Sequence, residues 1–415
     1  MKKSVSAVSI FCIVVAAAWP GTSARAQDAP AEGWPPKVEQ PQKAGEPISF
    51  VPLPVWATLP NEGNTYGFMP VFLDNDADGR IKAITAPSVT WNDVTEITGT
   101  ARYFQFPNDF EERVFQASYG TRLFREVIAD WLVAPTEKGR FTFNASFNYR
   151  KDPFRRFFGL GMNSSPDDET SYTLEGSRGY LKVGYNLTNR INAAVYGGMT
   201  TSQPENDGVE KVRKTQSRFS DVKGIDGSTT IISGVGFRYD SRSAREYSTT
   251  GMLLDAGFGG AKSNVAKNGL YGVIKLDGRL LWEETKRVNG AARVNWAHAF
   301  GSDIPFYERP SLGGSFLLRG FILDRFVDNA AWSVDFEQRI TAWVLHVEGS
   351  TVHVRLDPFV TVGQVYHHAG DMFDKVQFAP GLGIRAFSPP NVIGRIDIAK
   401  GGPNLNIFVE LGYPF

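Results

Sequence analysis

The chain has 415 residues, of which 42 are glycine and 13% are aromatic, with 30 phenylalanines. Its mean hydropathy of −0.23 excludes a bundle of membrane-spanning helices, and its 44 basic and 44 acidic residues give no cationic surface for nucleic acid. Abundant glycine and aromatic residues favour many strands joined by tight turns, with aromatic girdles.

The N-terminal segment has the pattern of a secretory signal peptide. A cationic start, an apolar stretch and a small-residue cleavage site follow one another at Met1–Lys3, Val5–Trp19 and Ala24–Ala26. We predict a signal peptide over 1–26; an N-terminal anchor helix is the alternative, but the apolar stretch is short for a membrane span. The only cysteine, Cys12, lies inside it, so the mature chain is expected to lack disulfides, cysteine nucleophiles and cysteine metal ligands.

The next segment, 27–48, is polar and contains five prolines. This composition predicts a disordered periplasmic arm that is too short for a folded domain. No second linker follows, so 49–415 is predicted to form one domain. Removal of 1–26 leaves 41 basic residues against 44 acidic ones, which again gives no footprint for nucleic acid.

Apolar and polar residues alternate with period 2 along most of 49–415. In 140–150, five apolar residues share one face and six polar residues the other, and 331–341 repeats the pattern. Alternation alone fits either a soluble sandwich, with the apolar face as core, or a membrane barrel, with that face toward lipid. The signal peptide, the undivided array of segments and the terminal aromatic residue favour a transmembrane antiparallel β-barrel.

The alternating segments predict sixteen strands, and one of them, 114–133, is long enough to be two. The predicted strands are 65–73, 82–91, 96–106, 114–133, 140–150, 172–186, 191–203, 229–239, 251–260, 271–282, 291–299, 331–341, 353–366, 377–387, 392–398 and 406–415. With both termini in the periplasm, the odd-numbered connections are extracellular and most are long, whereas several even-numbered ones are short, as such barrels require. An even number of strands also closes the sheet.

The last predicted strand ends the protein. Ile407, Val409, Leu411, Tyr413 and Phe415 are expected on one face. A terminal phenylalanine with an aromatic residue two positions earlier resembles the C-terminal signal of outer-membrane barrels. Pro414 lacks an N–H, so the final pairing is expected to be bulged or open on one side.

One glycine-rich apolar stretch, Arg309–Phe321, lies between two predicted strands and ends in Leu318-Arg319-Gly320-Phe321. A single cation in an apolar run needs a buried or lumenal partner. This motif closely resembles the [VI]RG[FY] motif of the BamA/TamA superfamily of outer-membrane assembly barrels, also called bacterial surface antigens. Three further stretches resemble that family in the expected order: 157–163, 239–242 followed by Gly251, and 381–389.

The resemblance covers about 65–415 and implies a long extracellular loop that folds back into the barrel. It also implies that the motif arginine, Arg319, is held by a carboxylate on the inner wall, and Glu337 is the matching residue. A second family position, an aspartate, is Thr361 here, and Asp335 or Asp357 is a possible replacement. Other inward-facing charges are expected to form an ion-pair lattice, with a structural role favoured over ion selectivity: Arg238, Arg339, Arg355, Arg385, Arg395, Asp240 and Asp397.

The implied function is assistance to proteins, or lipid, that enter or cross the outer membrane of a Gram-negative bacterium. A weak seam between 65–73 and 406–415 would admit a client strand. The arm is too short for the POTRA domains that receive clients in the family, so a separate POTRA-bearing or lipoprotein partner is expected. The alternatives are a passive channel or structural barrel without a client, and a surface-binding or enzymatic role of the loops 151–171 and 204–228. No cofactor is expected.

Two other patterns carry weaker predictions. Asp74, Asp76 and Asp78 match the first half of a calcium loop, but the twelfth position is Thr85 instead of glutamate. An acidic extracellular turn is the preferred interpretation. The five histidines lack metal-ligand spacing, and no G-x-S-x-G motif is present, so neither a metal nor a hydrolase site is predicted.

Overall fold

The computed structural model describes residues 48–76, 81–108, 110–134, 139–243, 248–266, 268–347, 350–388, 391–410 and 414–415. The predicted signal peptide and nearly all of the predicted arm therefore lie outside the described residues. Within those residues, no helix is long and apolar enough to span a membrane.

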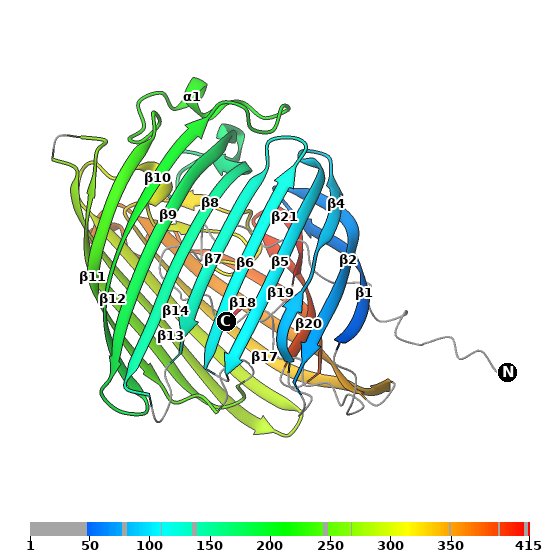
Figure 1. Ribbon diagram of the computed structural model, residues 1–415. Helices are drawn as coiled ribbons and strands as arrows, with labels where there is room; N and C mark the ends of the chain where they lie inside the picture. Colours follow the sequence, from blue (N-terminus) through cyan, green and yellow to red (C-terminus); the bar gives the residue numbers. More distant parts are fainter. Residues whose placement is uncertain are drawn as a thin grey trace.

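The described chain forms one closed antiparallel sheet (Figure 1). Its strands are β1 (Ile48–Leu59), β2 (Gly63–Asn75), β3 (Ile81–Thr85), β4 (Ser88–Asn92), β5 (Glu96–Asn108), β6 (Glu111–Gly120), β7 (Arg125–Val133), β8 (Phe141–Phe157), β9 (Thr170–Asn186), β10 (Ile191–Glu205), β11 (Ser228–Asp240), β12 (Gly251–Ser263), β13 (Leu270–Thr285), β14 (Val288–Phe300), β17 (Ala330–Val347), β18 (Ser350–Tyr366), β19 (Gln377–Ser388), β20 (Asn391–Gly401) and β21 (Asn404–Glu410). Apart from β3 and β4, each strand pairs with the next, and β1 pairs with β21, which closes the barrel.

Strands β3 and β4 share one position in the wall, because both pair with β2 and with β5. The interruption between them contains Pro87, which lies opposite Pro70 if the register of β2 with β3 and β4 is continued. Neither proline can donate a hydrogen bond, so the ladder breaks there. The barrel therefore has 18 strands, with β3 and β4 as two halves of one.

The prediction of an all-β transmembrane barrel is confirmed, but the count of sixteen strands needs two corrections. The segment 114–133 is two strands, β6 and β7, joined by a tight turn at 121–124. The strand β1 was missed because Pro52 and Pro54 argue against a strand interior. Both added strands precede the long loops. Because they are two in number, every later connection stays at its predicted end of the barrel, and the alternation of long and short connections is preserved.

The two faces of the wall carry opposite residue types. Along β8, Phe141 is 69% exposed and Phe147 also points outward, whereas Asn144 and Arg150 are buried. This excludes the sandwich alternative, because the apolar face points outward and the polar face encloses the interior.

The long connections gather at one end of the barrel, which we call the loop end. They are 158–169 with η2 (Pro166–Asp168), 206–227 with α1 (Thr215–Arg218), 301–329 with η3 (Phe306–Glu308), β15 (Ser311–Leu312) and β16 (Phe326–Val327), and 367–376 with η4 (Ala369–Asp371). Aromatic and aliphatic residues of two of these loops and of the adjoining ends of β8 and β9 pack together: Phe157, Tyr172, Ile225, Phe306 and Val327.

The opposite end, where β1 begins and β21 ends, is called the terminal end. Asp74 pairs with Ile48, so Asp74 and Asp76 lie at the terminal end, and their prediction as part of an extracellular loop is wrong. Asp78 lies outside the described residues. Among the residues that the structure describes, no group of three or more His, Asp or Glu side chains is placed to hold a metal ion.

Candidate functional site

The loop 301–329 folds into the barrel and lies against the inner wall. Its apolar residues pack on wall residues of β17, β18 and β19 in one cluster: Leu312, Leu318, Phe321, Phe326, Ala331, Val365 and Ala379. Gly320 has a φ of 120°, and its carbonyl accepts a hydrogen bond from Asn406 Nδ2 at 2.6 Å. A Cβ on Gly401 of β20 would lie 1.9 Å from the Gly320 oxygen. Glycine is therefore needed on both sides of this contact.

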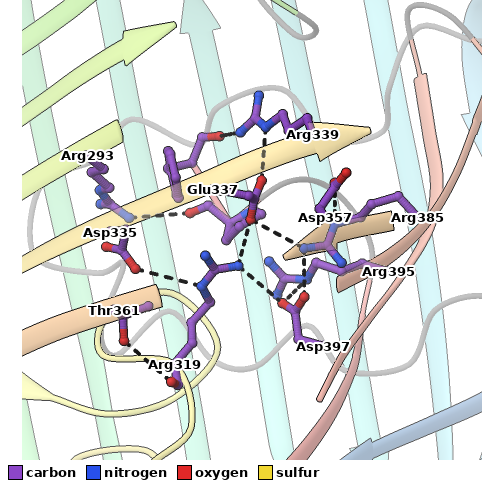
Figure 2. Close-up of polar contacts among 12 residues, drawn as sticks. Arg293, Arg319, Asp335, Glu337, Arg339, Asp357, Thr361, Arg385, Arg395 and Asp397 are labelled. Atoms are coloured by element: carbon purple, nitrogen blue, oxygen red, sulfur yellow. Dashed lines mark hydrogen bonds and ion pairs between the residues drawn. The ribbon is translucent and has the colours of Figure 1, made fainter. Parts of the chain in front are cut away.

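The motif arginine is fully buried against acidic residues of the wall (Figure 2). Arg319 Nη1 donates to Glu337 Oε2 at 2.9 Å. Its Nε lies 3.7 Å from Asp335 Oδ1, and its Nη1 lies 3.7 Å from Asp397 Oδ2. The guanidinium carbon is 3.7 Å from the centroid of the Phe359 ring, which makes this a cation–π contact as well as an ion pair.

Glu337 joins the motif to further arginines of the inner wall. Its Oε1 accepts from Arg339 Nε at 2.9 Å, and its Oε2 lies 3.7 Å from Arg385 Nη2. Arg385 Nη2 is also 2.6 Å from Asp397 Oδ1, and Arg395 pairs with Glu410 of β21. Charges buried this deeply are tolerated only in mutual compensation, so the cluster holds loop 301–329, β17, β19, β20 and β21 as one unit.

The structure brings Arg319 and Glu337 together as the family resemblance implied, and their functional role remains a prediction. The Thr361 hydroxyl donates to the Arg319 carbonyl at 3.5 Å, so it holds the backbone of the motif and not its charge. Asp335 is one of the carboxylates beside the guanidinium, whereas Asp357 pairs with Arg355 and Arg385.

The predicted ion-pair lattice divides into separate groups. Arg238 pairs with Asp255 on β12, and Asp240 pairs with Arg242, so the single lattice that included both residues needs correction. Phe359 was missed as a site residue. A signal was present, because it is the aromatic member of the otherwise polar inward run Arg355, Asp357, Phe359 and Thr361.

An Omp85 superfamily domain matches residues 105–400 of the chain. The chain belongs to the Omp85 superfamily. This confirms the resemblance to BamA/TamA barrels and places the protein in the outer membrane of a Gram-negative bacterium. Among the residues that the structure describes, the Omp85 barrel is accompanied by no POTRA domain.

Solved structures share the fold at low sequence identity. A crystal structure of BamA from Haemophilus ducreyi lacking POTRA domains 1–3 has a TM-score of 0.55 and 14% identity, over 89% of this chain and 75% of that chain. CdiB from Escherichia coli has a TM-score of 0.50 and 12% identity, over 90% of this chain and 64% of that chain. The chain thus spans less than two thirds of the CdiB chain. No curated protein matches the sequence.

The C-terminal residue of this Omp85 barrel also reaches the arginine cluster. The described part of the last strand reaches Glu410, and Pro414 and Phe415 are not in a strand, so the strand does not continue to the predicted 415. The Phe415 oxygen accepts from Arg339 Nη2 at 3.0 Å, and the Phe415 ring centroid lies 5.5 Å from the Arg339 Cζ atom. The expectation that Phe415 shares the outer face of a continuous strand is therefore wrong. Tyr413 lies outside the described residues, and the role of both residues as an assembly signal remains a prediction.

The turn 60–62, which follows β1, is tied across the loop end to β8. Asn61 Nδ2 donates to the Phe154 carbonyl at 2.9 Å, and Arg156 Nη2 donates to the Asn61 carbonyl at 3.2 Å. On the same strand, Arg155 Nη1 donates to Asp324 Oδ2 of the in-folded loop at 3.0 Å. Strand β8 therefore contacts both the in-folded loop and the turn that leaves β1.

Proposed function

We propose that this Omp85 barrel assists the insertion or translocation of proteins, or of lipid, at the outer membrane through a lateral seam between β1 and β21. Membership of the superfamily supports a general role in protein translocation or assembly. The observation that carries the proposal is the limited pairing between the described residues of β1 and β21. Between described residues, β1 and β21 are paired only at Thr58–Val409, whereas β1 and β2 are paired from Ile48–Asp74 to Leu59–Gly63.

The seam involves a different first strand from the one predicted. The sequence placed it between 65–73 and 406–415, but 65–73 belongs to β2, which is fully paired on both sides apart from the break at Pro70. A client strand would pair with the free edge of β1 by β-augmentation, in which main-chain hydrogen bonds provide most of the affinity.

The arginine cluster is the brace that keeps the rest of the wall fixed while the seam opens. Arg319 links the in-folded loop to β17 and β20, and Arg395 extends the network to Glu410 at the end of β21. The brace positions strands and performs no chemical step, so the proposed function needs no cofactor.

A disulfide across the seam tests the proposal. The variant Thr58→Cys with Val409→Cys places two cysteines at the one paired position, where Cβ atoms are close enough for a disulfide. We expect oxidation to reduce outer-membrane protein or lipid assembly in cells that depend on this copy, and a reductant to restore it.

A matched control is Thr100→Cys with Ser118→Cys, a facing pair on β5 and β6 whose hydroxyls lie 3.1 Å apart. It adds a disulfide of the same kind within a fully paired part of the wall and should leave assembly unchanged. If the seam disulfide forms completely and outer-membrane composition stays as in the control, the proposal fails, and a passive channel or structural barrel becomes the better hypothesis.

A separate periplasmic partner and the signal peptide over 1–26 also belong to this proposal. Crosslinking of intact outer membranes followed by purification of the barrel should recover a POTRA-bearing protein or a lipoprotein. Reproducible recovery of the barrel alone would argue against a partner-dependent role. N-terminal sequencing of the mature protein should begin at Gln27.

A further inference from the structure

The free edge of β1 contains two prolines, Pro52 and Pro54, that bear directly on the seam. In an antiparallel pair, the N–H and C=O groups of alternate residues point to opposite sides of the strand. The pairing of β1 with β2 therefore fixes the side to which the backbone N–H and C=O groups of each β1 residue point.

The continuous register between β1 and β2 decides that side. Pro52 faces Pro70, and Pro54 faces Phe68. If the backbone groups of these prolines pointed toward β2, the Pro52–Pro70 position would lack both of its hydrogen bonds. The ladder would then break, as it does between β3 and β4. The ladder is unbroken from Ile48 to Leu59. The backbone N–H and C=O positions of the even-numbered residues of β1 therefore point away from β2, toward β21.

The orientation of the even-numbered residues also explains where β1 and β21 meet. Thr58 is an even-numbered residue with an N–H, and it is the residue that pairs with Val409. Further from the loop end, the edge offers donors at Trp56, Phe50 and Ile48 but none at the two prolines between them.

Extension of the Thr58–Val409 register along the edge shows what the prolines face. Each step toward the terminal end adds one residue to β21 and removes one from β1, so Pro52 would face Phe415. The last residue of the chain would thus meet a residue that cannot donate. Phe415 lies instead on Arg339 inside the barrel.

We infer that Pro52 and Pro54 keep the seam open by removing the donors that the C-terminal residues of the chain need in order to complete the wall. An unpaired N–H in lipid costs several kcal/mol, and proline has no such group to leave unpaired. Without these two N–H groups, the edge is less costly to leave unpaired. It also selects client strands that pair near Thr58 and Trp56 or near Phe50 and Ile48, with a gap between. This selection rests on the proposed function, whereas the effect on pairing does not.

Amide hydrogen exchange of the folded barrel in lipid nanodiscs tests the inference. In the variant Pro52→Ala with Pro54→Ala, the restored donors should pair with the C-terminal residues, and exchange within 48–59 should slow by at least about tenfold, as expected for hydrogen bonds worth about 1 kcal/mol each. Deletion of Phe415 in the same variant should reverse part of this slowing of amide exchange.

The control is Pro204→Ala, a proline of β10 in register with Leu174 and far from the seam. Heat-modifiable migration on gels reports whether each barrel is folded, and the single variants Pro52→Ala and Pro54→Ala replace the double variant if it does not fold. An exchange rate in 48–59 equal to that of the control overturns the inference. Slower exchange with unchanged outer-membrane assembly supports the inference and contradicts the proposed function.

Discussion

The wall around Glu337 and the seam beside Thr58 are two parts of one sheet with opposite construction. Strands β17 and β18 are paired from Ala330–Tyr366 to Val347–Ser350, and buried ion pairs attach the in-folded loop to β17 and β20. Strands β1 and β21 share one paired position among the described residues. The difference indicates that stability is concentrated in the wall that carries the buried ion pairs and not at the seam.

Removal of the motif arginine should have the largest effect on this contrast. Arg319→Ala removes one of the three arginines around Glu337 and the arginine paired with buried Asp335, which should lower the free energy of unfolding by about 3–5 kcal/mol. Urea unfolding followed by tryptophan fluorescence measures it. Arg218→Ala is the control, because its ion pair with Asp168 is solvent-exposed, and should cost about 1 kcal/mol or less. If both variants lose the same free energy of unfolding, the arginine cluster does not keep the wall fixed.

The close approach of the loop to β20 should be the next most sensitive feature. Gly401→Ala would place a Cβ 1.9 Å from the Gly320 oxygen, so the loop must shift, at a cost of about 1–3 kcal/mol. The same urea experiment applies. Gly99→Ala, where no atom lies within 4 Å of the added Cβ, should leave stability nearly unchanged. A tolerated Gly401→Ala would mean that the loop is not held against the wall.

Loss of the C-terminal ring should have a smaller effect. Phe415→Ala removes the ring from Arg339 and Arg319, and cation–π contacts of this kind contribute about 0.5–2 kcal/mol. Phe415→Trp keeps a ring and should retain most of the stability. Identical unfolding curves for the two variants would show that the tail does not stabilise the cluster.

A further effect should come from pH at the turn after β1. Burial raises the pKa of the Glu62 carboxyl from 4.5 to about 7, and Asp152 adds to the shift, against the opposing arginines Arg150, Arg155 and Arg156. The folded chain therefore holds this proton more tightly than the unfolded chain. Stability contributed by Glu62 is complete below pH 4.5, falls as pH rises to about 7, and then stays constant.

Amide exchange of the turn 60–62 at pH values on either side of this window, corrected for intrinsic exchange rates, measures the Glu62 effect. Glu62→Gln should abolish the pH dependence. Glu96→Gln, a change at the exposed first residue of β5 at the same end, should preserve it. A dependence that persists in Glu62→Gln would assign the titration to another group.

Much of the fold was predictable because lipid outside and charge inside impose period-2 alternation on every strand. That pattern located most strands and the inward position of Glu337. It failed at β1, where the prolines tolerated on a free edge look like breaks in a strand. It failed again at the C-terminus, since alternation through 406–415 does not reveal that the partner strand lacks donors at the matching positions.

The candidate site was predictable only in part. The residues 318–321 identified the loop, and the family resemblance supplied Glu337. The sequence did not show that Asp397 and Phe359 complete the surroundings of Arg319, because their approach depends on how strands β18 and β20 curve around the loop. The division of the expected lattice into separate pairs has the same cause, since Arg238 meets Asp255 through a register that sequence alone leaves open.

The attachment of Asn61 to β8 has a mechanical consequence for β1. The strand is anchored at its loop end by that attachment and by the Thr58–Val409 pair, while its other extremity has only β2 beside it among the described residues. If the proposed function holds, opening of the seam would start at the terminal end of β1, away from these two attachments.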